Sequence, residues 1–142
     1  NKLPNDRNQT NALQAAIDLE QVGQIKHANR SYQAIAKRWP NSYVAVMGMA
    51  NTSLSLHQPE RATSSYLHAA QLQPQQADIY NNLAYSLQAQ SCYQASLISI
   101  QCAITLEPIN PEYQDSLREL TQAAKLKVES KTCPKITCPG KD

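Results

Sequence analysis

The chain has 142 residues, of which 42% are hydrophobic and 17% are charged, and its net charge is +2 at pH 7. This length allows one hydrophobic core, and the small charge gives no indication of binding to nucleic acid or to an anionic membrane surface. No run of about 18 apolar residues exists, so the sequence predicts no transmembrane segment. It shows no signal peptide and begins at Asn1 rather than at methionine, which favours a processed form or a fragment of a longer protein.

Residues 1–8 are polar and contain Pro4, so we expect a leader or the end of a linker there. Apolar residues three and four positions apart then predict six helices, at about 9–22, 25–38, 42–56, 59–72, 76–89 and 92–106. Asn110 and Pro111 begin a seventh helix, which extends to about residue 128. Residues 129–142 contain two prolines, a glycine and two cysteines, and we expect an extended tail.

The chain repeats itself with a period of 34 residues, which is the spacing between Pro40, Pro74 and Pro108. Aligned on these prolines, the units share small residues at one place and large residues four places later, namely Ala28, Ala62 and Ser96, then Tyr32, Tyr66 and Ile100. Small residues let helices cross closely while large neighbours fill the space beside them. The period predicts three helix-turn-helix repeats, at about 9–42, 43–76 and 77–110, with residues 111–128 as a capping helix.

This pattern resembles the tetratricopeptide repeat, over residues 9–108. The third unit matches best, through Tyr80, Leu83, Ala84, Leu87, Tyr93, Ala103 and Pro108. The first unit departs from the family pattern at Ala12 and Ala15, where the family has Trp and Leu. The resemblance implies an all-α, right-handed solenoid over residues 9–128.

The stretches RWPNSYVAVMGMAN and YNNLAYSLQAQSCYQAS, together with the cysteine-containing tail, also resemble, less closely, part of a peptidase family. That part is the C-terminal repeat region of bacterial papain-like peptidases, relatives of those that cut double-glycine leaders. The catalytic Cys and His of that family belong to an N-terminal domain, so the resemblance assigns no catalytic residue here. It implies that the chain is the non-catalytic region of a larger exported peptidase.

In the tetratricopeptide family, the first helix of each unit lines a concave groove. The resemblance therefore implies a groove that binds a peptide or protein and is lined by Leu13, Ile17, Met47, Asn51, Leu54, Asp78, Asn81, Asn82, Tyr85 and Gln88, with Asp115 and Glu119 from the cap. Asn and Gln side chains can pair with both groups of an extended peptide backbone. Alternatively, Leu13, Ile17, Met47 and Leu54 pack between neighbouring first helices or against a segment before Asn1.

The family's clamp for a C-terminal carboxylate uses Lys, Asn, Asn, Lys and Arg. This chain has Leu13, Ile17, Gly48, Asp78 and Asn82 at those places, so the resemblance argues against such a clamp. The three histidines, His27, His57 and His68, are scattered, and no catalytic or phosphate-loop motif occurs. We therefore expect no catalysis, no cofactor and no metal site.

The four cysteines lie in the last third of the chain. Cys92 and Cys102 are separated by about 15 Å along one helix, too far to bond each other or to hold one metal ion. The capping helix should run antiparallel to the helix at 92–106, so the tail returns to Cys92, and we predict the pairs Cys92–Cys133 and Cys102–Cys138. A local Cys133–Cys138 bond and four free thiols are the alternatives. Disulfides would indicate an exported, periplasmic or envelope-associated protein, and free thiols a cytoplasmic one.

Overall fold

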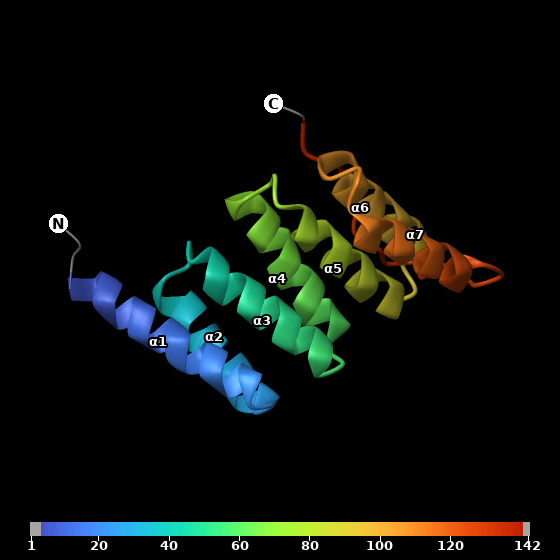
Figure 1. Cartoon of the computed structure of the whole chain (residues 1–142). Coiled ribbons are helices and arrows are strands. Elements are labelled where there is room, and N and C mark those ends of the chain that lie inside the picture. Colours follow the sequence, from blue (N-terminus) through green and yellow to red (C-terminus); the bar gives the residue numbers. More distant parts are fainter. Residues whose placement is uncertain (1–3, 141–142) are drawn as a thin grey trace. The chain divides into compact units, whose positions relative to one another are not determined.

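The structure is a computed structural model that describes residues 4–140, and within this range it contains helices and no strand (Figure 1). The helices are α1 (Pro4–Gln21), α2 (Ile25–Arg38), α3 (Tyr43–Ser55), α4 (Pro59–Leu72), α5 (Ala77–Ala89), α6 (Tyr93–Leu106) and α7 (Pro111–Ala124). The all-α prediction is therefore confirmed. None of these helices is long and apolar enough to cross a membrane.

Two predicted ends need correction. Helix α1 begins at Pro4, so residues 4–8 are helical rather than a leader, and proline is well suited to a first helical turn because its missing N–H breaks no bond. Residues 1–3 of the expected leader lie outside the described residues. Helix α7 ends at Ala124 rather than near residue 128, because Leu126 adopts a positive φ of 58°. Leu126 and Val128 are exposed, so the apolar spacing beyond Ala124 has no surface to pack on.

The turns inside the three predicted repeats share one geometry. Gly23, His57 and Ser91 have positive φ angles of 83°, 59° and 61°, and they lie 34 residues apart. After each of them, a backbone N–H donates to a carbonyl five residues earlier, as in Gln58 to Ser53 at 2.9 Å. This is the Schellman arrangement that ends a helix. The 34-residue period is therefore present in the backbone as well as in the sequence.

The described chain divides into two compact units inside α4, one ending at His68 and the other beginning at Ala69. In the N-terminal unit, Ala16, Ala28, Tyr32, Ile35 and Ala45 form a buried core. Two polar contacts add to it: Tyr32 donates its hydroxyl to Glu20 at 2.8 Å, and the Asn29 amide donates to Thr52 at 2.8 Å. The second contact joins α2 to α3.

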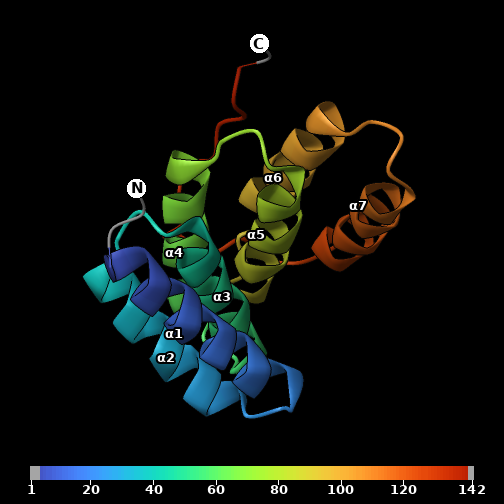
Figure 2. The same cartoon turned by 60° about the vertical axis from the view of Figure 1, so that its left-hand side comes forward.

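The C-terminal unit contains α5, α6, α7 and the tail. Small side chains of α6 lie against the backbone of α5: Ser96 Oγ donates to the Ala84 carbonyl at 2.8 Å and Ser99 Oγ to the Tyr80 carbonyl at 2.7 Å. Both serines are buried, so these bonds satisfy hydroxyls that would otherwise destabilise the core. Beyond α7 the tail turns back as an extended segment (Figure 2).

Candidate functional site

The groove residues expected in the N-terminal unit are largely engaged in packing. Leu13 and Ile17 are half-buried and lie against the core of that unit, and Met47 is buried. Leu54 is half-buried, and Asn51 Oδ1 accepts a hydrogen bond of 2.5 Å from the Tyr66 hydroxyl. Leu13 and Ile17 therefore contribute to the packing of the N-terminal unit.

The groove residues expected in the C-terminal unit lie on α5, and one of them has an unusual environment. Asn81 is only 5% exposed; its amide nitrogen donates to Asn82 Oδ1 at 3.4 Å. Its own Oδ1 is buried and has no hydrogen-bond partner among the described residues. Asp78 is exposed, whereas Asn82, Tyr85 and Gln88 are partly exposed. Helix α5 thus combines accessible polar groups with one buried acceptor that the fold does not satisfy.

Helix α7 contributes acidic side chains to the same region. The Tyr85 hydroxyl donates to Glu119 Oε2 at 2.6 Å, which joins α5 to α7. Burial, followed by this hydrogen bond, raises the pKa of Tyr85. Burial also raises the pKa of Tyr113 to about 12, with smaller contributions from the negative charges of Glu107, Asp78 and Glu112. We call the surface formed by Asp78, Asn81, Asn82, Tyr85 and Gln88 of α5 with Glu112, Asp115 and Glu119 of α7 the α5–α7 face. Its charged groups are acidic, and one of them, Asp115, is ion-paired with Arg118.

The raised tyrosine pKa values predict a delayed alkaline titration. The folded protein favours the neutral phenol of Tyr113, so its contribution to stability is complete below pH 10 and is lost as the pH rises through about 12. We expect the phenolate absorbance of the folded protein at pH 11 to correspond to fewer than the seven tyrosines of the chain. Tyr113→Phe should remove part of the phenolate absorbance that develops above pH 11. Simultaneous ionisation of all seven phenols near pH 10 would contradict this prediction.

Two disulfides attach the tail to α6 and its N-terminus. Cys92 is bonded to Cys133 with a Cα–Cα distance of 5.5 Å, and Cys102 to Cys138 with a distance of 5.1 Å. This is the pairing that we expected from the sequence, and the described residues include no free cysteine. The tail also bonds through its backbone to the turn between α5 and α6, because Ser130 N–H donates to the Ser91 carbonyl at 2.9 Å.

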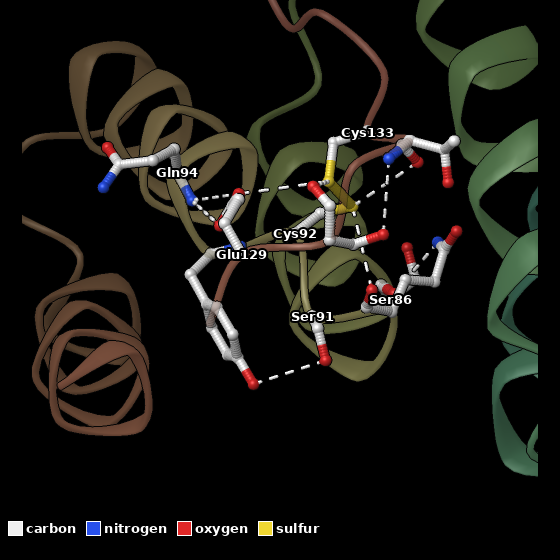
Figure 3. Close-up of a disulfide and its surroundings, with 10 residues drawn as sticks. Ser86, Ser91, Cys92, Gln94, Glu129 and Cys133 are labelled. Carbon is white, nitrogen blue, oxygen red and sulfur yellow. Dashed lines mark hydrogen bonds between the residues drawn. A yellow bond between two sulfur atoms is a disulfide. The ribbon is translucent and has the colours of Figure 1, made fainter. Parts of the chain in front are cut away.

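A tail carboxylate that the sequence analysis missed, Glu129, lies beside the Cys92–Cys133 disulfide. Glu129 Oε1 accepts hydrogen bonds from the backbone N–H groups of Tyr93 at 2.7 Å and Gln94 at 3.2 Å (Figure 3). These groups belong to the first turn of α6, where N–H groups have no partner within the helix. Cys92, the N-cap of α6, makes no side-chain cap itself, so Glu129 supplies the cap from 36 residues away. Within residues 4–140, His, Cys, Asp and Glu do not cluster in threes as a metal site would require.

Comparison with known proteins gives matches only among solved structures. No family model matches the sequence, and no curated protein matches it. The first TPR domain of Spaghetti (RPAP3), solved with the HSP90 peptide SRMEEVD, has a TM-score of 0.76 and 19% identity, covering 81% of this chain and 91% of that one. The TPR domain of Arabidopsis OM64 has a TM-score of 0.77 and 15% identity, covering 82% and 96%.

A larger protein also matches. The O-GlcNAc transferase of Thermobaculum terrenum, in its K341M mutant, has a TM-score of 0.80 and 17% identity, and the match covers 89% of this chain and only 24% of that one. At these identities the likeness concerns the fold alone. The chain has the tetratricopeptide-repeat fold.

Proposed function

We propose that the chain binds a peptide or an extended segment of another protein, without catalysis of its own, and that the α5–α7 face carries the binding. The observation that supports this most strongly is the unpartnered Oδ1 of Asn81. A buried acceptor without a partner costs about 1–3 kcal/mol, and native proteins contain few of them. Turning of the Asn81 side chain on binding would bring this oxygen to a backbone N–H of an extended ligand, while Asn82 and Gln88 add partly exposed amide groups.

The acidic character of the face suggests which peptides it accepts. Asp78, Glu112 and Glu119 favour ligands with neutral or basic side chains and disfavour a terminal carboxylate. The RPAP3 structures contain the acidic peptides SRMEEVD of HSP90 and SGPTIEEVD of HSP70. This chain has no Lys or Arg at the places where the family holds such a carboxylate, and we therefore propose a different ligand class.

A second candidate function is that of the non-catalytic region of a larger exported cysteine peptidase. The two disulfides favour an oxidising compartment, such as the periplasm or another part of the envelope. In that setting the α5–α7 face would hold a substrate or a partner for a catalytic domain elsewhere in the protein. The cytoplasmic alternative requires that the four thiols be free in the cell.

We also propose that the chain is divided into repeats at 9–42, 43–76 and 77–110. The 34-residue spacing of the turns at Gly23, His57 and Ser91, which have positive φ angles, supports these boundaries.

The proposal predicts that Asn81→Leu separates stability from binding. Leucine has the branched shape of asparagine, although it is larger, and it removes the unsatisfied oxygen, so we expect the free energy of unfolding to stay the same or to rise. Affinity for peptides selected on the oxidised protein from a displayed random library should fall by about tenfold or more, which corresponds to one lost hydrogen bond in a buried site. Urea unfolding and calorimetric titration measure the two quantities.

Gln101→Ala is the matched control, because Gln101 is an exposed polar residue on α6 of the same unit. It should bind the selected peptides with the affinity of the original protein. If Asn81→Leu also binds them unchanged, or if the library yields no specific peptide, the proposed face is wrong.

A further inference from the structure

We propose that the N-terminal unit contains a binding site for a phosphate group, either the free ion or a phosphate monoester. The site is a cavity of about 320 Å³ between α2, the end of α3 and the start of α4. This volume lies at the lower end of the range for small-ligand pockets, which is roughly 300–1,000 Å³. It does not involve the α5–α7 face.

The cavity is lined by three cations and by no acidic side chain. Lys26 and Arg30 are four residues apart on α2, which places them on one face of that helix, and Arg61 comes from the first turn of α4. Their combined charge exceeds the net charge of +2 on the whole chain. Among the described residues, none of the three forms an ion pair; the ion pair that the structure records joins Arg118 to Asp115. All three side chains are exposed, so water screens part of their attraction, but no carboxylate that lines the cavity neutralises their positive charge.

The polar floor of the cavity is held in place by hydrogen bonds within the unit. Asn29 donates to Thr52 and to Ser53 Oγ at 3.1 Å, and Gln33 Nε2 donates in turn to Asn29 Oδ1. Both Asn29 and Gln33 line the cavity. Binding an ion there would not require Asn29 and Gln33 to become ordered, whereas the exposed Lys26, Arg30 and Arg61 would lose side-chain freedom.

Gln58 gives an independent indication of a ligand. It lines the cavity, and its side-chain oxygen is buried without a hydrogen-bond partner among residues 4–140. Rotation of the amide by 180° exchanges its oxygen and its NH₂ group in the same space, so Gln58 can present two donors to a bound oxyanion. In that orientation the NH₂ group donates to the anion, and the oxygen takes the position that the NH₂ group now holds.

The N-terminus of α4 adds to the positive electrostatic potential of the cavity. The first N–H groups of a helix have no acceptor within it, and they give the N-terminus a partial positive charge that favours phosphate. Glu60 lies in the same turn, but it does not line the cavity. A phosphate offers several oxygens to Arg30 and Arg61, whose planar groups suit it better than they suit a monovalent ion such as chloride.

The test is calorimetric titration of the oxidised protein with inorganic phosphate and with O-phosphoserine, at constant ionic strength. We expect saturable binding of phosphate, weakened by about tenfold or more in Arg30→Gln and in Arg61→Gln. Lys37→Gln is the matched control, because it removes the same charge from an exposed position of α2 outside the cavity. Asn81→Leu should leave phosphate binding unchanged, so this site and the peptide face can fail separately.

The two probes distinguish the sources of the phosphate group. Binding of both supports a site for phosphate monoesters, and binding of inorganic phosphate alone supports a site for the free ion. Circular dichroism checks that the variants fold. The proposal is overturned if neither probe binds at millimolar concentration, or if Lys37→Gln loses as much affinity as the arginine variants.

Discussion

Gly48→Ala is expected to destabilise the N-terminal unit by about 1–3 kcal/mol, the usual cost of overpacking a core. Gly48 lies in α3, where a Cβ atom would come within less than 3.0 Å of three ring atoms of Tyr32. The ring cannot move away freely, because Tyr32 is only 2% exposed and its hydroxyl is bonded to Glu20. Alanine gains about 1 kcal/mol in helix propensity over glycine, so the steric cost has to exceed that gain.

Urea unfolding followed by circular dichroism measures this effect, and Tyr32→Leu provides the background that isolates it. In that variant the ring is absent, so Gly48→Ala should be neutral or stabilising. The interaction energy between positions 32 and 48 is the change in unfolding free energy caused by Gly48→Ala in the original protein minus the change that it causes in the Tyr32→Leu variant. Equal effects of Gly48→Ala in both backgrounds would show that Tyr32 is not what requires a glycine.

Removal of Cys102 and Cys138 together, as a double serine variant, is expected to lower the free energy of unfolding by about 4 kcal/mol. The bond closes a loop with a sequence separation of 36, and the Cys92–Cys133 bond closes one of 41. By the loop-entropy model, each bond alone contributes about the same free energy of unfolding. The loops overlap, so the second bond shortens a loop that the first has already closed, and removal of both should cost less than twice as much.

Urea unfolding of the double variants and of the original protein gives these values. A non-reducing peptide map with prior alkylation establishes the bonds themselves. Linked peptides joining Cys92 to Cys133 and Cys102 to Cys138 are the expected result. Four alkylated thiols, or a peptide with a Cys133–Cys138 bond, would contradict the pairing and also remove the support for an exported protein.

The helices and the cysteine pairing could be predicted from the sequence because they depend on regular spacing. The apolar period gave the interiors of all seven helices, and the distance between Cys92 and Cys102 along α6 matches the reach of the tail between Cys133 and Cys138. Helix ends were less predictable. They depend on single residues such as Pro4 and Leu126, whose local conformation the period does not encode.

The candidate sites depend on contacts between distant residues, which spacing does not reveal. A positive φ at His57 and Ser91 could be inferred only from the alignment with Gly23, since neither residue is a glycine. The missing partner of Asn81 Oδ1 depends on the packing around it, and so does the cap that Glu129 makes on α6. Likewise, Lys26 and Arg30 are neighbours on one helix face, but the third cation of the cavity, Arg61, comes from another helix.

Chemical-shift mapping tests most directly whether the α5–α7 face binds peptide. The ¹⁵N-labelled oxidised protein is titrated with a library-selected peptide, and both backbone and side-chain amide resonances are followed. We predict the largest shifts for Asn81, Asn82 and Tyr85 and for the first turns of α7, with Lys26, Arg30 and Arg61 unchanged. Shifts confined to α6 and the tail, or to the N-terminal unit, would contradict the proposed site.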